Sequence, residues 1–226
     1  MFQDRFTRQD EPDPRVRSTL NLLQRLLNPQ DHVVEIGVSS VKQHDLSFKH
    51  RLQHSHWESV DKFGNPDHVA DLDGPDARLP FDDRTIDLVV CTEVLEHLRE
   101  GSFLVREISR VLKPTGHAVV SVPNITSLKS RVRWASGRIP HMAASGDCGH
   151  PLGGTGSLQN GSWVAAHVVD FSPSRLKAYL ERGGLRVETH CSMPLRLSRH
   201  FPSIEVPGTI MPRALADFVL VVAAPA

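Results

Sequence analysis

The sequence predicts an α/β fold in which a mostly parallel β-sheet is covered by helices on both faces. Short, mainly apolar runs rich in valine alternate with longer stretches whose apolar residues recur at helical spacing. Strands buried on both faces have such runs, and parallel strands need helical crossovers between them. With 226 residues, 39% of them hydrophobic, the chain is long enough to bury one sizeable core of this kind.

The first half of the chain supplies helices and strands in this alternating order. Residues 1–30 comprise a polar lead-in and an amphipathic helix over 15–27, which Asn28-Pro29 ends. We expect this helix to cover one face of the sheet. Strands are expected at residues 33–37, 57–61, 69–72 and 86–91, followed by a helical stretch at 93–98.

The second half continues the alternation and ends with two closing strands. We expect a helix at 102–112, a turn at 113–116, and strands at 118–122, 185–190 and 218–222. Ser172 and Pro173 suit the N-cap and the first position of a last helix, which Gly183-Gly184 would end. Together these segments predict a sheet of seven strands.

A glycine-rich segment interrupts the alternation at residues 141–163. Five glycines lie between Gly146 and Gly161, and the segment shows little periodicity. Long loops of this kind in compact domains are often lids or binding loops. We therefore expect a single domain over residues 1–226, in which this segment is a loop or lid.

Charge and cysteine usage disfavour several kinds of protein. Lys plus Arg total 26 and Asp plus Glu total 26, whereas a protein that grips nucleic acid usually has a basic excess. The three cysteines are widely spaced and form no CxxC pair, so neither a disulfide framework nor a zinc ribbon is predicted. No apolar run approaches the roughly 20 residues that span a bilayer, and the N-terminal stretch lacks an apolar signal core. We expect a cytoplasmic protein with no membrane span; a homodimer is left open.

Three motifs within residues 33–124 carry a resemblance to a known family. They are Val34-Glu35-Ile36-Gly37, the stretch from Leu79 to Leu98 that includes Thr92-Glu93-Val94-Leu95-Glu96-His97, and the stretch from Glu107 to Gly116. In this combination and order they resemble the core of the S-adenosylmethionine-dependent methyltransferases of the Rossmann-like, class I type. The resemblance implies a doubly wound sheet whose last strand is antiparallel, S-adenosylmethionine as the cofactor, and methyl transfer as the reaction.

Residues at predicted strand ends are the candidates for binding the cofactor. Parallel strands bring their carboxyl ends to one edge of the sheet, which is where ligands bind in open α/β folds. Asp61 can accept hydrogen bonds from both hydroxyls of a ribose, and Gly37 allows the backbone to approach closely. Glu35 can meet the cationic amino end of the methyl donor, directly or through water.

The resemblance adds four candidates and leaves one choice open. It implies that Asp71 and Leu72 lie near the adenine, with Asp73 as the alternative carboxylate, and that Thr92 and Glu93 lie near the methionine portion. Acidic residues at strand ends are also common turn formers. Each of these residues therefore fits a structural role as well, and the joint pattern is what favours binding.

The first motif departs from the family pattern, and this departure leaves functions other than small-molecule methyl transfer open. The family usually has glycines at alternate positions after the acidic residue, whereas here only Gly37 matches and Ser39 and Val41 take the other two positions. A non-catalytic protein of the same fold, acting as a partner or scaffold, is one alternative, and an RNA or protein methyltransferase is another. A nicotinamide-dependent dehydrogenase would require G-x-G-x-x-G, which residues 37–42 do not provide.

Two histidines are the candidates for catalysis. Methyl transfer is an in-line displacement in which an oxygen acceptor must lose its proton, and histidine is the natural base near neutral pH. His97 is the second residue of the Glu-His pair that follows the fourth predicted strand. The resemblance implies that His167, shortly before Phe171-Ser172, lies on the acceptor side. We expect methyl transfer to a small-molecule or glycan-like acceptor, at oxygen, although both histidines also fit a structural role.

Two further clusters have an open role. His141, Cys148 and His150 suit zinc, but together with His167 they match no familiar zinc spacing, so no metal is predicted. A basic stretch with Trp134 could bind a phosphate or carboxylate of the acceptor, or form a solvated helix face. The basic residues are Lys129, Arg131, Arg133 and Arg138.

Overall fold

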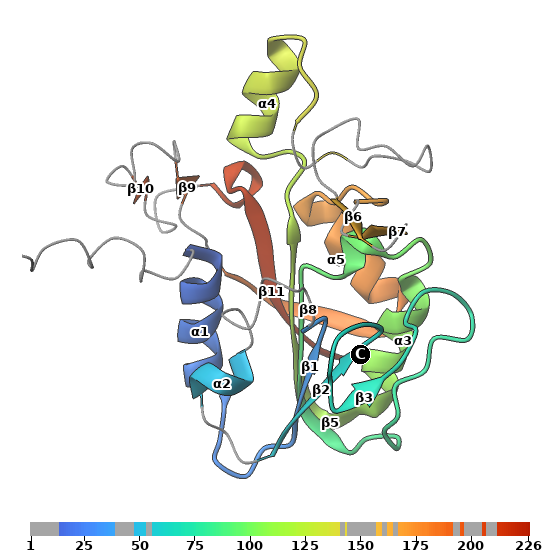
Figure 1. The fold of residues 1–226 in the computed structure, drawn as a ribbon. Coiled ribbons are helices and arrows are strands. Elements are labelled where there is room, and N and C mark those ends of the chain that lie inside the picture. Colours follow the sequence, from blue (N-terminus) through green and yellow to red (C-terminus); the bar gives the residue numbers. More distant parts are fainter. Residues whose placement is uncertain are drawn as a thin grey trace, which may run out of the picture.

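A seven-stranded sheet forms the centre of the structure, with the strand order β3-β2-β1-β4-β5-β11-β8 (Figure 1). The structure is a computed structural model that describes residues 14–38, 48–52, 56–140, 143, 157–159, 162–164, 167–191, 195–196, 205–206 and 212–226. The seven strands are β1 (Val33–Ile36), β2 (Trp57–Asp61), β3 (His68–Val69), β4 (Ile86–Thr92), β5 (Leu112–Pro123), β8 (Leu185–Cys191) and β11 (Phe218–Pro225).

The sheet is doubly wound and mostly parallel. The pairs from β3 through β5 are parallel, whereas β11 runs antiparallel to both β5 and β8. The chain begins in the middle at β1, builds outward through β2 and β3, and then returns to β4 on the other side of β1. The switch point of the topology therefore lies between the carboxyl ends of β1 and β4, where ligands bind in such folds. This confirms the predicted fold, including the antiparallel last strand.

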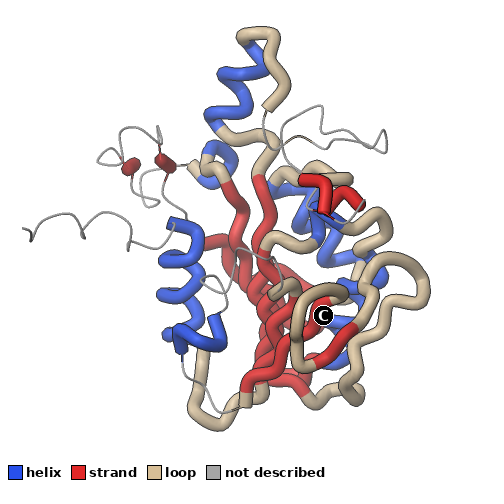
Figure 2. Tube along the Cα trace, viewed as in Figure 1, coloured by secondary structure: helices blue, strands red, loops and turns tan. Residues whose placement is uncertain are grey.

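Helices cover both faces of the sheet, as Figure 2 shows. One face carries α1 (Pro14–Leu26) and α2 (Phe48–Leu52), and the other carries α3 (Ser102–Val111) and α5 (Pro173–Arg182). Along β4, Leu88 and Val90 pack in the cluster that includes α1, whereas Val89 and Cys91 pack in the cluster that includes α3 and α5. Successive residues of β4 thus face two different apolar layers, which explains why its central residues 88–91 are all apolar.

The second and third motifs are connected by one arginine. Arg110 of α3 donates to the carbonyl oxygens of Leu79 (3.1 Å) and Phe81 (2.9 Å) and pairs with Asp83 at 2.6 Å. Glu107, also paired with Arg110, accepts a hydrogen bond from the backbone N–H of Leu79 at 2.9 Å. These bonds fasten the loop before β4 onto α3, so this part of the family pattern supports the fold.

Three predicted elements differ from the structure. The predicted helix at 93–98 is reduced to the short 3-10 helix η1 (Leu95–His97), because Glu93 takes a left-handed backbone with φ +57°. The predicted strand at 69–72 ends at Val69. The predicted turn at 113–116 belongs to β5, where a Cβ on Gly116 would lie 2.9 Å from the carbonyl oxygen of Ile86. The absence of that side chain lets the two backbones lie close together.

The capping prediction for the last helix is confirmed. The Ser172 side chain accepts a hydrogen bond from the N–H of Arg175, and proline occupies the first turn of α5. A further helix, α4 (Leu128–Ala135), follows β5 and projects beyond the carboxyl edge of the sheet (Figure 1). Ser127 caps it by accepting from the N–H of Ser130 at 3.2 Å.

The segment predicted as a lid lies largely outside the described residues. Within 141–163 the structure describes Ala143 and an antiparallel pair, β6 (Ser157–Gln159) and β7 (Ser162–Val164). The remaining elements are β9 (Leu195–Arg196), β10 (Glu205–Val206) and the 3-10 helix η2 (Arg213–Leu215). Among the described helices, none combines the length and the apolar character that crossing a bilayer requires.

Candidate functional site

Gly37 follows β1 at the switch point and has no room for a side chain. Its φ is +85°, and its N–H donates to the carbonyl oxygen of Val60 at 3.0 Å. A Cβ at this position would lie only 2.3 Å from Cγ2 of Val94. The backbone of β1 and the segment after β4 therefore approach each other closely at the edge where a ligand would bind. Ser39 and Val41, the departures in the first motif, lie outside the described residues.

Glu35 is a buried carboxylate with three described hydrogen-bond donors. The backbone N–H groups of Phe48 (3.1 Å) and Lys49 (3.2 Å) and the indole N–H of Trp57 (3.0 Å) donate to it. These donors compensate for burying its charge, since the residue is only 4% exposed. The described contacts of Glu35 thus join β1 to α2 and β2, and its predicted contact with the methyl donor stays a prediction.

Asp61 lies at the carboxyl end of β2, beside β1. Its Oδ1 accepts a hydrogen bond from the N–H of Phe63 at 3.0 Å, and its side chain is partly exposed. Its backbone oxygen accepts from the N–H of Ala70 at 2.9 Å, which holds the segment after β3 against β2. The carboxylate therefore stands at the edge that the ribose prediction requires, and the ribose contact itself is untested.

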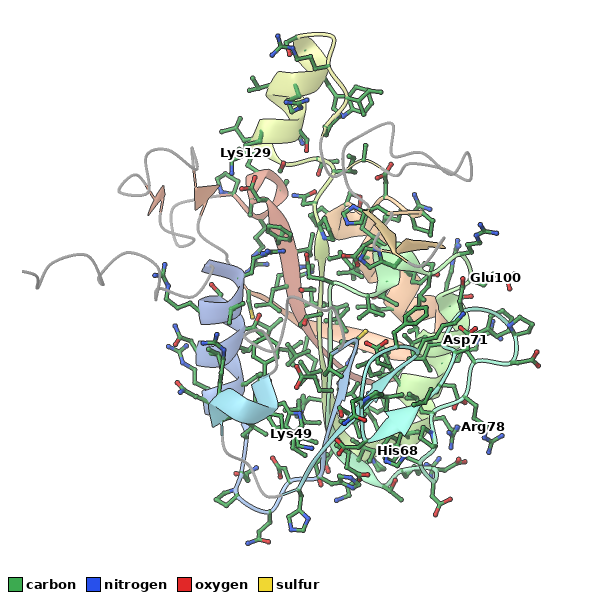
Figure 3. The ribbon with its side chains drawn as sticks, in the orientation of Figure 1. Lys49, His68, Asp71, Arg78, Glu100 and Lys129 are labelled. Atoms are coloured by element: carbon green, nitrogen blue, oxygen red, sulfur yellow. The ribbon has the colours of Figure 1, made fainter. Side chains whose placement is uncertain are left out.

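Asp71 and Leu72 follow β3 and differ in exposure. Asp71 is 54% exposed at its side chain and pairs with Lys62 at 2.6 Å, and this hydrogen bond lowers the pKa of the Asp71 carboxyl. Figure 3 shows Asp71 on the same side of the molecule as Glu100. Leu72 is only 6% exposed and packs in the core. Asp73, the alternative carboxylate, accepts a hydrogen bond from the N–H of Glu100 at 2.9 Å. The contacts of Asp71 and Leu72 with adenine stay predictions.

Thr92 and Glu93 end β4, and Glu93 is held from two sides. Thr92 pairs in register with Ser121 of β5. The N–H of Glu93 donates to the Ser121 carbonyl oxygen (2.9 Å), and the Ser121 hydroxyl donates to Glu93 Oε1 (2.9 Å). Glu93 has a left-handed backbone. This conformation costs a residue other than glycine on the order of 1 kcal/mol and is often found at functional sites.

Arg15 of α1 also reaches this edge, and the sequence analysis missed it. Its guanidinium donates to Glu93 Oε2 at 3.2 Å and lies 4.5 Å from the ring centroid of Phe218. The two partners of the ion pair are 78 residues apart in the chain. No local pattern in the sequence could have revealed the contact, because it depends on where α1 packs on the sheet.

His97 and His167, both predicted to be catalytic, lie together in the structure. Their ring centroids are 5.0 Å apart. The approach is set by the backbone, because the N–H groups of Val168 and Val169 donate to the carbonyl oxygen of Glu96 at 2.7 and 3.1 Å. His167 is 8% exposed, and the side chain of His97 is 29% exposed. His141, Cys148 and His150, whose side chains suit zinc but for which no metal was predicted, lie outside the described residues.

Glu96 completes this cluster and was not among the predicted site residues. It is 2% exposed, and neither carboxylate oxygen has a hydrogen-bond partner in the described part of the chain. Its Oε1 lies 3.8 Å from Nε2 of His97. Burial, reinforced by the charge of Glu93, holds the pKa of the Glu96 carboxyl well above its usual range. The Glu-His pair in the second motif was the available signal for it.

The basic stretch lies on and after α4, beyond the carboxyl edge. Lys129 lies at the base of α4 (Figure 3). It pairs with Asp217, and burial raises the pKa of the Asp217 carboxyl. Arg131 donates to the carbonyl oxygen of Thr126 at 2.8 Å, and Arg133 donates to that of Ile139 at 3.0 Å. Exposed apolar side chains lie among them: Leu128, Val132, Trp134 and Ile139.

Comparison with known proteins agrees with this geometry. Residues 24–120 match the family model of the methyltransferase domain. Two curated relatives, each described as a probable S-adenosylmethionine-dependent methyltransferase, come from Mycobacterium tuberculosis and Mycolicibacterium smegmatis. Each is 40% identical to this chain over 62 residues, which are 27% of this chain and 20% and 22% of the relatives. The match thus spans about a fifth of the relatives' length.

Solved structures share the fold over most of the chain. The CcbJ methyltransferase of Streptomyces caelestis has a TM-score of 0.58 at 14% identity, covering 96% of this chain and 97% of that chain. An S-adenosylmethionine-dependent methyltransferase of Mesorhizobium loti has a TM-score of 0.52 at 16% identity, covering 92% and 97%. The Burkholderia thailandensis 1,6-didemethyltoxoflavin-N1-methyltransferase, solved with that compound and S-adenosylhomocysteine, has a TM-score of 0.52 at 14% identity, covering 93% and 78%.

The motifs, the strand order and the comparisons point to the same class of protein. Residues 24–120 resemble a class I S-adenosylmethionine-dependent methyltransferase domain, and the sheet has the fold of that class. The predicted resemblance and fold are therefore confirmed, and the comparisons support the predicted cofactor.

Proposed function

We propose that this protein, as a single domain over residues 1–226, transfers the methyl group of S-adenosylmethionine to an oxygen atom of a small-molecule or glycan-like acceptor. The observation that carries the proposal is the juxtaposition of His97 and His167, with ring centroids 5.0 Å apart, beside the carboxyl end of β4. A pair of imidazoles next to the expected methyl donor suits an acceptor that must lose a proton.

The residues at the carboxyl edge fit the cofactor. Gly37 has no side chain and lets the backbone of β1 lie close to Val94 at the edge where the cofactor would bind. Asp61 provides a carboxylate at the end of the neighbouring strand, which suits a ribose diol. Glu93, at the end of β4, would lie near the methionine portion. S-adenosylmethionine, when bound, supplies an electrophilic methyl group on a sulfonium.

The chain's own residues would then orient the acceptor and take up its proton. Methyl transfer requires the acceptor oxygen, the methyl carbon and the sulfur to lie in line, so most of the rate enhancement comes from orientation. An imidazole of His97 or His167 within hydrogen-bond reach of the acceptor hydroxyl could accept its proton near neutral pH. His167 is mostly buried, which suits a group that must work away from bulk water.

A non-catalytic role for the same fold is the second candidate. The observation that favours it is the engagement of Glu35, whose carboxylate accepts from two backbone N–H groups and the indole of Trp57. A carboxylate with these partners needs no cofactor to explain why it is buried. This candidate predicts a folded protein that binds neither S-adenosylmethionine nor S-adenosylhomocysteine.

Calorimetric titration of the purified chain with both compounds separates the two candidates. We expect binding in the micromolar range, weakened about 10- to 100-fold by Asp61→Ala, because two hydrogen bonds are worth about 1–3 kcal/mol together. The matched control is Asp82→Ala, an exposed aspartate outside the carboxyl edge, which should bind like the wild type. Absence of binding by a folded wild-type chain would move the conclusion to the non-catalytic role.

A further inference from the structure

Three side chains with metal-binding chemistry converge beside the carboxyl end of β4. Glu96 and His97 come from η1, and His167 comes from the segment that precedes α5. Each offers one ligand atom, and these atoms all lie within 4.8 Å of one another. One carboxylate and two imidazoles from separate parts of the chain are therefore gathered at one point.

The spacing of the cluster is close to what a single ion requires. Ligand atoms at about 2.1 Å from a tetrahedral ion lie about 3.4 Å from each other. Oε1 of Glu96 lies 3.8 Å from Nε2 of His97. A movement of a few tenths of an ångström would bring these two atoms to an ion between them. All three ligand atoms lie within 4.8 Å of one another, so shifts of up to roughly 1.4 Å in a pair distance, within the reach of side-chain rotation, would complete the site.

Glu96 gives an independent reason to expect a cation. The carboxyl group is 2% exposed, and both of its oxygens lack a hydrogen-bond partner among the described residues. An ionised carboxylate buried without a partner is strongly unfavourable, so the group must either keep its proton or meet a positive charge. Arg15, whose charge acts on Glu96, donates a hydrogen bond to Glu93.

We propose that Glu96, His97 and His167 bind a divalent transition-metal ion, which in turn binds the acceptor oxygen. Two imidazoles and one carboxylate suit zinc, manganese, iron or cobalt, whereas magnesium and calcium prefer oxygen ligands alone. Three protein ligands leave coordination positions open, and the 29% exposure of the His97 side chain gives access to them.

The ion would act on the acceptor, and this part of the inference rests on the proposed function. A hydroxyl bound to the ion loses its proton to water more readily, and the resulting oxygen attacks the methyl carbon. The O–CH₃ bond forms as the S–CH₃ bond breaks with its electron pair going to sulfur, which leaves S-adenosylhomocysteine. The two histidines would then serve as ligands, and the hydroxyl would need no imidazole to accept its proton.

Metal titration of the full chain tests the site without cofactor or acceptor. The protein is freed of metal with a chelator, then titrated with Co²⁺ while visible absorption is recorded, and with Zn²⁺ by calorimetry. We expect one equivalent to bind, and we expect Glu96→Gln and His167→Asn each to weaken binding at least about tenfold. The matched control is His117→Asn, because His117 lies on β5 beside Glu188 and outside the cluster.

Measuring the unfolding of the chelated proteins shows whether a variant loses metal binding only because its fold is destabilised. Glu96→Gln replaces a buried carboxyl that accepts no hydrogen bond from the described residues, so the chelated variant should be at least as stable as the chelated wild type. Stoichiometric binding that both cluster variants lose supports the site. No binding, or equal binding by the wild type and both variants, overturns it.

A methyl-transfer assay distinguishes failure of this inference from failure of the proposed function. Transfer to a hydroxyl acceptor that persists with chelator and in Glu96→Gln would overturn the role of the ion and leave the proposed function intact. Metal binding by a chain that binds no S-adenosylmethionine would overturn the proposed function and leave the metal site intact.

Discussion

Replacing Gly37 by alanine would introduce a methyl group against Val94 and a side chain at a left-handed backbone position. The backbone cost of alanine at φ +85° is about 1 kcal/mol. The new Cβ would lie 2.3 Å from Val94 Cγ2, so the two atoms must separate by roughly 1.5 Å to reach normal contact. Moving Val94 or the backbone costs about 1–3 kcal/mol more. We therefore expect Gly37→Ala to lower the free energy of unfolding by about 2–4 kcal/mol.

A double-mutant cycle with Val94→Ala isolates the steric part. Alanine at position 94 removes Cγ2 and keeps Cβ, which lies at an acceptable 3.7 Å from the added atom. Val94→Ala alone should cost about 1 kcal/mol, because Val94 is only partly buried. In the double variant only the backbone cost and the Val94 cost remain, so the two changes should couple by about 1–3 kcal/mol.

Urea unfolding at constant pH measures all four proteins of the cycle. If the two substitutions prove additive within about 0.5 kcal/mol, the clash with Val94 is not the source of the cost. In that case the close approach of β1 and the segment after β4, on which the ligand argument for Gly37 depends, would also be wrong.

Two further predictions concern ion pairs. Arg15→Ala should lower the free energy of unfolding by about 0.5–1.5 kcal/mol, since it removes both the pair with Glu93 and the contact with Phe218; a change within experimental error in urea unfolding would contradict both contacts. The pKa of Asp67 is lowered to about 2, first of all by its hydrogen bond to Lys49. Because the folded pKa is depressed, this stabilisation is present above the unfolded pKa and is lost as the pH falls toward 2. The cost of Asp67→Asn at pH 7, below about 1 kcal/mol for so exposed a pair, should therefore disappear near pH 2, and a cost that does not vary with pH would contradict the assignment.

Most of the sheet could be predicted from sequence because its signal is local. Runs such as 86–91 are apolar at every residue except Asp87, and the structure buries β4 against helices on both faces. The helical stretch predicted at 93–98 is shorter in the structure, for a non-local reason. Glu93 leaves β4 in a left-handed conformation with its N–H bonded to Ser121, and nothing within the segment itself indicates that bond.

The candidate site also contains some features that the sequence could predict and others that it could not. Residues at strand ends, such as Gly37 and Asp61, could be selected because parallel strands bring their carboxyl ends to one edge. The contact of Arg15 with Glu93 and the approach of His167 to Glu96 depend on how α1 and the segment before α5 pack. Sequence reasoning chose the two histidines separately, and their meeting required the three-dimensional structure.

Hydrogen bonds to the carbonyl oxygen of Glu96 join the chain segments that carry His97 and His167. This oxygen accepts from two successive backbone N–H groups, those of Val168 and Val169, directly after His167. When these two bonds open, the backbone next to His167 loses its attachment to Glu96. The rate at which the two amide hydrogens exchange with deuterated solvent therefore reports how often this attachment opens. A ligand that bridges the two histidines would slow the exchange at these two amides.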